Sequence, residues 1–350
     1  MKNNSNKNRI YVLDDLRGIA ILLVVFFHYV INIDLSNMGI QSTFTNTLVS
    51  FSDYFNLGSF AVSLFFLISG FVIPMSLHGD DRLKVIKRFA IKRFFRLYPT
   101  YWFAIIFISA IILLFKDETE YTLKQILINF TMFQDFLKQK SIDGVFWTLM
   151  IELKFYILTA MLFFFGWLKH IKYVMFIFLA FSMVTLLLGY YDGVKGFYNF
   201  TISYLFLMYL GTSFYFVYKQ ELSERSLRFM ILMVGLYFLI YPLFAHERGK
   251  FDLIGYSTST ILAIVMFTYF INQKKSISKI TTFFGNISYS FYLLHQVLGY
   301  FVISLLLSHN MYLPLAQFVT FLLATVMAMF SYKFVEIKTN KFGHRFVKNI

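Results

Sequence analysis

A series of long apolar stretches constrains this chain more than any other feature, because it continues from one end of the sequence to the other. A membrane-spanning helix needs about 20 consecutive residues that are mostly apolar. The sequence therefore predicts an all-α polytopic membrane protein with about ten transmembrane helices. The expected spans are, approximately, 15–33, 55–77, 99–115, 145–167, 171–189, 200–218, 227–245, 252–271, 285–308 and 313–333.

The composition fits one membrane domain. Charged residues make up only 14% of the chain and hydrophobic residues 58%, whereas about 25% of the residues of a soluble domain are charged. No internal repeat and no linker rich in Pro, Gly or Ser divides the sequence. We therefore predict a single transmembrane domain over 1–350, with short cytoplasmic tails at 1–14 and 334–350.

The positive charge is distributed unevenly between the loops. If the N-terminus is cytoplasmic, most of the 32 Lys and Arg residues lie on the cytoplasmic side and few lie outside, as the positive-inside rule requires. Both termini are therefore predicted to be cytoplasmic. Contact with anionic membrane lipids accounts for the net charge of +14, so no nucleic-acid partner is expected.

Two segments between the spans admit more than one interpretation. The amphipathic segment 121–137 fits an interfacial or re-entrant helix, or an ordinary surface helix in a loop. The loop 78–98 carries seven basic residues, which fit contact with anionic head groups or a surface that binds the phosphates of a cytoplasmic ligand. Arg93 and Arg96 would share one face of a helix, because they are three residues apart. The seven are Arg82, Lys84, Lys87, Arg88, Lys92, Arg93 and Arg96.

Four ionisable residues lie within the predicted spans, where such groups are costly and are candidates for function. Arg17 and His28 are eleven residues apart, so on one helix they face the same way, separated by about 16 Å. Glu152 and His295 are predicted at a depth similar to that of His28. The four residues therefore indicate a shared polar crevice at the centre of the bundle.

Each of these residues also has a purely structural interpretation. Arg17 could extend to the membrane surface, with Asp14 or Asp15 as its partner. The two histidines could be core residues with satisfied hydrogen bonds. Glu152 could pair with Lys154 or with a tyrosine hydroxyl.

The residue types in the crevice limit the chemistry. A histidine that is oriented by a carboxylate can accept a proton from a hydroxyl group, which suits acyl transfer to an alcohol. The same residue types suit proton relay in a transporter. The chain has no cysteine, so disulfides, thiolate metal sites and a cysteine nucleophile are excluded. The histidines are scattered, so no metal site is predicted.

Six stretches together resemble the acyltransferase 3 family of membrane acyltransferases, in the same order and over essentially the whole chain. Each stretch alone is a weak signal, whereas six in register are a strong one. They are LDDLRGIAILLVVFFH, which contains Arg17 and His28, FFLISGFVIP (65–74), KRFFRLYPTYW, which contains Arg93 and Arg96, FWTLMIELKFY (146–156), GNISYSFYLLH (285–295) and, near the C-terminus, YKFVEIKTNKF.

The resemblance implies ten core helices and transfer of an acyl group from cytoplasmic acyl-CoA to a hydroxyl. The acyl group is most often acetyl, and the acceptor is usually a carbohydrate or glycolipid of the cell envelope. Many members carry an additional soluble esterase-like domain, and this chain is expected to be the stand-alone form. Acetyl-CoA, or another acyl-CoA, would be a co-substrate, so no permanently bound cofactor is expected. The expected location is the bacterial inner membrane.

The matching positions also imply roles for the ionisable residues. His28 would be the catalytic histidine, acting as general base or as a relay that carries the acyl group. Arg17 would support His28 or the donor. Glu152 would assist His28 or bind the acceptor.

Further positions in the same stretches are expected to bind the two substrates. The phosphates of CoA would face Arg93 and Arg96, together with the neighbouring Arg88 and Lys92. Gly70 would be a point of close approach to a ligand, because glycine has no side chain. The expected acceptor pocket contains Ser69, Gly70, Trp147, Tyr156, Tyr292 and His295.

The sequence thus predicts a membrane-embedded O-acetyltransferase that acts on a cell-envelope carbohydrate. The alternative is a transporter or exporter of a lipid-linked sugar or small solute, which would use the histidine and glutamate residues for proton coupling. Such a transporter should contain broken helices in matching halves of the chain, and the sequence shows no such repeat.

Overall fold

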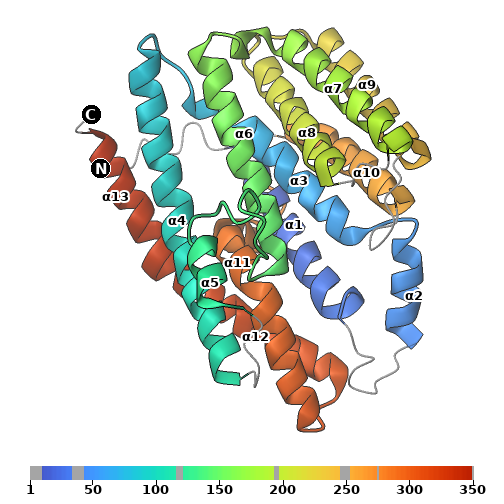
Figure 1. The fold of residues 1–350 in the computed structure, drawn as a ribbon, viewed down its shortest axis with the longest axis vertical. Coiled ribbons are helices and arrows are strands. Elements are labelled where there is room, and N and C mark those ends of the chain that lie inside the picture. Colours follow the sequence, from blue (N-terminus) through green and yellow to red (C-terminus); the bar gives the residue numbers. More distant parts are fainter. Residues whose placement is uncertain are drawn as a thin grey trace.

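The computed structural model describes residues 10–33, 43–115, 121–192, 197–244, 253–273 and 276–348. Within these ranges the regular structure is entirely helical, without a strand, and the long helices pack side by side (Figure 1). Nine helices in the described part of the chain are long and apolar enough to cross a membrane. The structure therefore confirms the all-α fold class, and these nine helices are candidate membrane-spanning segments.

The first predicted span is the one that falls outside these nine helices. It corresponds to α1 (Tyr11–Phe26), which has only 16 residues and continues as a π-helical turn, Phe27–Ile31. A short helix, α2 (Thr43–Ser52), follows it. The other nine predicted spans correspond to α3 (Leu57–Val72), α4 (Arg82–Phe115), α6 (Trp147–Phe164), α7 (Ile171–Asp192), α8 (Phe197–Tyr218), α9 (Glu224–Phe244), α10 (Leu253–Ile271), α11 (Lys279–Ser308) and α12 (Leu313–Ser331).

Helix α4 is longer than the sequence predicts. The span expected at 99–115 extends back to Arg82, so the basic segment is helical and Pro99 lies inside the helix. At 34 residues and about 1.5 Å per residue, α4 is about 51 Å long, whereas the hydrocarbon core is about 30 Å thick. The expected boundary was wrong because charged residues end an apolar window without ending a helix.

The C-terminal segment is also helical. The tail predicted at 334–350 contains helix α13 (Ile337–Lys348), which a π-helical turn joins to α12. Helix α13 packs along α4. A Cβ atom at Gly343 would lie 2.7 Å from the Cβ of Phe95, so only glycine permits this close packing.

The amphipathic segment 121–137 forms a short helix followed by turns. Helix α5 (Leu123–Asn129) begins at a capping box, and the chain then turns repeatedly. The indole Nε1 of Trp102 donates to the carbonyl of Phe130, at 2.8 Å, which ties these turns to α4. The segment is therefore a folded connection to α6 and not one continuous amphipathic helix.

Helices α1 and α11 form the closest pair at the centre of the bundle. A Cβ atom at Gly18 would lie 1.8 Å from the carbonyl oxygen of Thr281, and one at Gly285 would lie 1.9 Å from that of Asp14. These two glycines allow the two backbones to touch. The contact fixes α1 against the helix that carries His295.

Asp15 anchors the same pair of helices at their N-terminal ends. It is fully buried and accepts hydrogen bonds from the backbone N–H of Ile277, at 2.8 Å, and from the hydroxyls of Thr281 and Thr282, at 2.7 and 2.6 Å. Asp15 therefore ties α1 to the start of α11, where Ser278 is the N-cap, and it is not the partner of Arg17.

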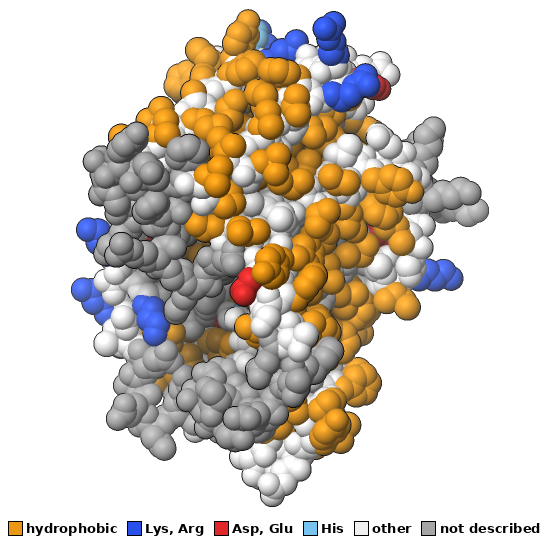
Figure 2. All heavy atoms as spheres, turned by 90° about the vertical axis from the view of Figure 1, so that its right-hand side faces the viewer, with side chains coloured by type: hydrophobic (Ala, Val, Ile, Leu, Met, Phe, Trp, Pro, Cys, Tyr) orange, Lys and Arg blue, Asp and Glu red, His pale blue; other side chains and the backbone are white. Residues whose placement is uncertain are grey.

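The outer surface of the bundle carries apolar side chains. Hydrophobic side chains cover much of the face shown in Figure 2, and several Lys and Arg side chains lie at its upper edge. On α9 and α10, Leu239 and Val265 are more than half exposed. A broad apolar surface of this kind fits contact with lipid.

Candidate active site

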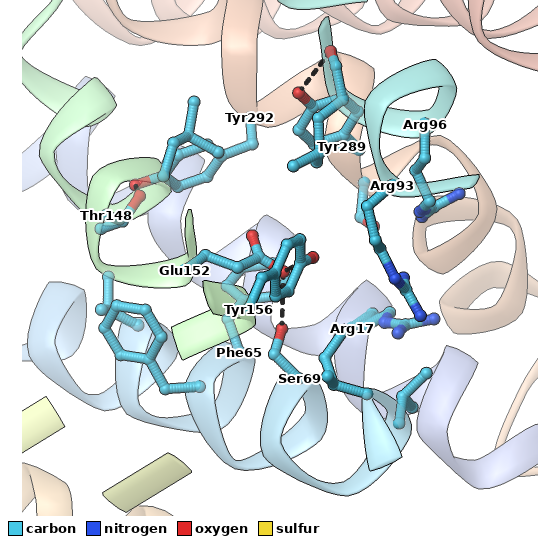
Figure 3. A pocket seen from close by; sticks show the side chains of 17 residues that line it. Arg17, Phe65, Ser69, Arg93, Arg96, Thr148, Glu152, Tyr156, Tyr289 and Tyr292 are labelled. Atoms are coloured by element: carbon cyan, nitrogen blue, oxygen red, sulfur yellow. Dashed lines mark hydrogen bonds between the residues drawn. The ribbon is translucent and has the colours of Figure 1, made fainter. Parts of the chain in front are cut away.

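A polar cavity lies where helices α1, α3, α4, α6 and α11 meet (Figure 3). It contains about 770 Å³ of space that no atom fills. Its walls combine apolar side chains with charged groups and hydroxyls from all five helices. The polar lining consists of Arg17, Ser69, Arg93, Arg96, Thr148, Glu152, Tyr156, Ser288, Tyr289 and Tyr292.

Three arginines gather at one end of this cavity (Figure 3). Arg17 pairs with Asp14, at 3.6 Å, and Arg96 pairs with Glu336, at 3.4 Å. The third, Arg93, has no carboxylate partner within the described residues. Because like charges repel at short range, an anionic ligand would be stabilised at this end.

Arg93 is held by weaker contacts than the other two arginines. Its Nη2 donates to the hydroxyl of Ser76, at 3.2 Å. Its guanidinium lies 5.4 Å from the ring centroids of both Phe89 and Tyr156, within the range of a cation–π interaction. Its Nε is buried without a hydrogen-bond partner among the described residues. Arg93 therefore retains the capacity to bind an additional acceptor.

Glu336 is a site residue that the sequence interpretation did not include. It lies in the π-helical turn between α12 and α13 and is 1% exposed. One carboxylate oxygen pairs with Arg96, and the other accepts from the hydroxyl of Ser290, at 2.8 Å. The available signal was an acidic residue within the stretch YKFVEIKTNKF, directly after an apolar span without any acidic residue.

Glu152 lies in the middle of the cavity and belongs to a short hydrogen-bond network (Figure 3). Its Oε1 accepts from the hydroxyl of Ser69, at 3.1 Å, and from that of Tyr156, at 2.5 Å. Lys154 pairs instead with Asp135, at 3.6 Å. Of the structural partners considered for Glu152, the tyrosine hydroxyl is therefore confirmed and the lysine is wrong.

The end of the cavity opposite the arginines is formed by Thr148 and Tyr292 (Figure 3). Their hydroxyl oxygens are 2.8 Å apart. The ring centroid of Tyr292 lies 5.7 Å from that of His295. Tyr292 thus separates the cavity from the histidines that lie behind it.

His28, in the turn that follows α1, and His295, in α11, lie close together. The ring centroids of His28 and His295 are 5.1 Å apart. The Nδ1 atom of His28 lies 3.0 Å from the hydroxyl of Tyr300 and 3.4 Å from the amide nitrogen of Gln296. His295 is fully buried, and its Nε2 has no hydrogen-bond partner in the described structure.

His28 does not line the cavity, although Arg17 does. The eleven-residue spacing assumes a regular α-helix, whereas the chain forms a π-helical turn from Phe27 to Ile31. Such a turn changes the rotation per residue, and it often occurs at functional sites. This turn begins only one residue before His28, so it changes little of the eleven-residue spacing. His28 lies about 16 Å further along the helix than Arg17, and Tyr292 closes the cavity before that level.

Glu152 does not contact either histidine. Its hydrogen-bond partners come from α3 and α6, whereas those of His28 come from α11. The prediction of a single cluster of His28, Glu152 and His295 is therefore corrected. The structure contains two separate clusters of polar residues, one around Glu152 and one around the two histidines, and Tyr292 lies between them.

Four other expected residues lie away from the cavity. A Cβ atom at Gly70 would lie 1.9 Å from the carbonyl oxygen of Met208, so this glycine permits packing of α3 against α8 and does not approach a ligand. Trp147 packs against Phe200 and Tyr204 of α8, edge-on to the first ring and tilted to the second. Arg88 and Lys92 lie on α4 and do not contribute to the lining.

A second cavity adjoins the end that carries the arginines. It contains about 650 Å³ and is lined from α1, α4, α11 and α13. Arg17 and Arg96 line both cavities. Lys341 and His344 of α13 contribute further basic groups to the second one. The two cavities therefore meet at a pair of guanidinium groups.

Asp143 precedes α6 and is fully buried. Its Oδ1 accepts from the backbone N–H of Val145, at 3.0 Å, and its Oδ2 has no partner among the described residues. Burial raises the pKa of this carboxyl to about 7, because the charged form loses hydration. Asp143 is thus a titratable group near neutral pH, next to the helix that carries Glu152.

The described residues contain no group of three His, Asp or Glu side chains that could hold a metal ion. The main cavity and the neighbouring histidine pair offer arginine, carboxylate, hydroxyl and imidazole groups. Together these groups can bind anions, transfer protons and orient a hydroxyl.

The comparisons with known proteins agree with this arrangement. The model of the acyltransferase 3 family, described as an acyltransferase domain, matches residues 10–332. No curated protein and no solved structure matches the chain. The family match covers nearly the whole chain, including every helix that lines the main cavity. The chain therefore belongs to the acyltransferase 3 family, and this membership indicates a multi-pass membrane acyltransferase.

Proposed function

We propose that the protein is an O-acetyltransferase of the bacterial inner membrane. It would transfer the acetyl group of cytoplasmic acetyl-CoA to a hydroxyl of a cell-envelope carbohydrate, such as O-antigen, exopolysaccharide or another glycan or glycolipid. The observation that carries the proposal is the polarity of the cavity. Three arginines lie at one end, and a histidine pair lies behind Tyr292 at the other.

The cationic end fits a donor that carries phosphate groups. Arg93 and Arg96 would bind the pyrophosphate of CoA, because planar guanidinium groups form paired hydrogen bonds with phosphate oxygens. Arg17 and Arg96 face both cavities, so CoA would extend from the cavity beside α13 into the central one. Arg88 and Lys92 would add positive potential along α4 and attract the donor.

The histidine end fits the transfer of a proton. In direct transfer, His28 accepts the proton of the acceptor hydroxyl, and the oxygen attacks the thioester carbonyl carbon. The carbon–sulfur bond then breaks, and the imidazolium returns the proton to the CoA thiolate. In the relay, an imidazole nitrogen of His28 first attacks the thioester carbonyl carbon, the carbon–sulfur bond breaks, and the CoA thiolate takes up the imidazole proton. The acceptor oxygen then attacks the acetyl carbon, the carbon–nitrogen bond breaks, and the hydroxyl proton returns to the imidazole. The hydrogen bond between Tyr300 and Nδ1 would orient the ring in either case.

Glu152 would fix the positions of the polar side chains that both substrates contact in the cavity. It holds Ser69 and Tyr156 in place, and its negative charge would offset part of the positive charge of the arginines. A hydroxylated acceptor could exchange hydrogen bonds with this network and with Thr148 and Tyr292. Glu152 would therefore contribute to acceptor binding and not to activation of His28.

The test is consumption of acetyl-CoA by the purified protein, measured as release of the CoA thiol, with membrane glycolipid extract as acceptor. The variant His28→Ala should lose about 100-fold or more of this activity, because general base catalysis contributes at least that much. The matched control is His78→Ala, since His78 is exposed and lies outside both cavities. Full activity of His28→Ala would contradict the mechanism.

A second experiment separates the two chemical routes. The protein is incubated with radiolabelled acetyl-CoA without acceptor, quenched and digested. Label retained on the peptide that contains His28 would exclude direct transfer as the only route. Absence of thiol release in the presence of every envelope fraction, with folded protein, would favour transport over acetyl transfer.

A further inference from the structure

An apolar groove lies between the first half of α4 and α6, beside the polar cavity. It contains about 950 Å³ of space that no atom fills. On α6 the lining residues recur every three or four positions, so this helix presents one face to the groove. On α4 they form a nearly continuous stretch from Phe89 to Tyr98. Apolar lining residues include Ile86, Ala90, Phe94, Leu153, Ile157 and Ala160.

The groove opens sideways and is closed at the end where α4 begins. Phe94 and Ile157 are 40% and 47% exposed on the outer surface of the bundle. At the N-terminal end of α4, beyond Ile86, the Nη1 of Arg82 donates to the carbonyl of Phe164, at 2.8 Å. This hydrogen bond joins the start of α4 to the end of α6. A ligand would therefore enter from the hydrocarbon phase of the membrane and not from water.

The wall between the groove and the polar cavity is thin. Arg93, Leu97 and Tyr156 line both spaces. Of the three cavity arginines, Arg93 is the one that has no carboxylate partner, and no hydrogen-bond partner for its Nε, in the described part of the chain. A positive charge at the junction of an apolar groove and a polar cavity complements a lipid that carries an anionic group at the end of its chain.

We propose that the groove holds the hydrocarbon chain of a lipid-linked acceptor. The phosphate of this acceptor pairs with Arg93, and its sugar extends into the polar cavity toward Tyr292. This assignment depends on the proposed function, because it specifies the class of acceptor: a sugar joined through phosphate to one long hydrocarbon chain. Arg93 then faces the lipid phosphate on one side and CoA on the other. The guanidinium groups of Arg17, Arg93 and Arg96 together bind two anionic ligands.

The position of Arg93 excludes one other occupant, the acyl chain of the donor. The thioester of an acyl-CoA lies at the opposite end of the molecule from the phosphates. The groove meets the cavity at the arginine end, where the phosphates of CoA would be bound, so a donor acyl chain would not reach it. The groove is a single space with one cationic side chain, Arg93, in its lining, so it suits a lipid with one hydrocarbon chain better than a lipid with two.

The test measures lipid binding to the purified full-length protein by native mass spectrometry, without acetyl-CoA. The probe is a long-chain polyprenyl monophosphate, compared with dioleoyl phosphatidylglycerol and uncharged polyprenol. Ile157→Trp fills the groove and should weaken binding of the polyprenyl phosphate about tenfold, or about 1.4 kcal/mol. Ile106→Trp is the matched control, because Ile106 is 60% exposed on α4 and lies outside the groove. Arg93→Gln should weaken binding of the phosphate and leave that of polyprenol unchanged.

Two results would overturn the assignment. The first is that Ile157→Trp, and also Ala90→Trp on the opposite wall of the groove, bind the polyprenyl phosphate as tightly as the wild-type protein does. The other is binding of phosphatidylglycerol as tight as that of the polyprenyl phosphate, which indicates an ordinary membrane lipid. Failure of the proposed function would appear separately, as lack of acetyl-CoA consumption by wild-type protein that still binds the lipid probe.

Discussion

Asp143 gives the protein a pH-dependent stability that can be measured at the scale of one residue. Its carboxyl keeps a proton up to about pH 7 in the folded state, whereas the unfolded carboxyl releases it near pH 4. The unfolded state therefore binds fewer protons between these values, and stability falls as the pH rises through this window. Above about pH 7 the loss is complete.

Replacement Asp143→Asn should remove this dependence, because the amide stays neutral. Between pH 5 and pH 7 the wild-type protein should lose about 2 kcal/mol more stability than the variant, at 1.36 kcal/mol per pH unit. Thermal unfolding of both proteins at pH 5, 6, 7 and 8 measures the difference. Parallel melting curves for the two proteins would show that Asp143 does not titrate in this range.

The site was predicted residue by residue with uneven success, for physical reasons. Arg17 and Glu152 line one cavity, because a charge within an apolar helix has few places to go except a polar interior. Arg93 and Arg96, which the sequence placed in a basic loop, line the same cavity because this loop is the first part of α4. The exclusion of His28 from this cavity could not be predicted, because helical periodicity gives the direction of a side chain but not the extent of a cavity, which here ends at Tyr292. Glu336 was overlooked because it follows the last span and resembles part of a charged tail.

At the scale of helices, the contact between α1 and α11 should depend on the size of residue 18. Gly18→Ala places a methyl group 1.8 Å from a backbone carbonyl oxygen, so a helix must move, at a cost of about 1–3 kcal/mol. Gly235→Ala on α9 is the matched control, because a Cβ atom there meets nothing within 4 Å. This control should gain up to about 1 kcal/mol from better helix propensity.

Melting temperatures of the two variants in the same detergent compare these effects. A Gly18→Ala variant as stable as Gly235→Ala would show that α1 and α11 do not approach as closely as described. Acetyl-CoA consumption by Gly18→Ala should also decrease, since Arg17 is adjacent and lines the cavity. The control at Gly235 should retain full activity.

The helices themselves were predictable from apolar length, and their ends were not. Apolar runs located the nine long helices, because length and hydropathy are what a bilayer selects. Helix α13 and the first half of α4 were assigned to a tail and a loop, since both are rich in Lys and Arg. They are helical because they pack against each other, with Gly343 against Phe95, and a pairing of distant segments is not visible in local composition.

At the scale of the whole molecule, the predicted orientation can be tested directly because the chain contains no cysteine. A single cysteine at His309, after α11, should react in intact cells with a thiol reagent that does not cross the inner membrane. A single cysteine at Lys219, after α8, should react only after the cells are opened. The reverse pattern would place both termini outside, contrary to the charge distribution.

The hydrogen bonds between Asp15 and the start of α11 have a consequence for the order in which the protein is assembled during synthesis. The two partners, Asp15 and Thr281, are 266 residues apart in sequence, so α1 leaves the ribosome long before the helix that completes its contacts. During this interval the carboxylate of Asp15 lacks its hydrogen-bond donors, and a carboxylate without partners is costly in a bilayer. The wall of the cavity that carries Arg17 is therefore completed only when α11, in the last quarter of the chain, has been synthesised.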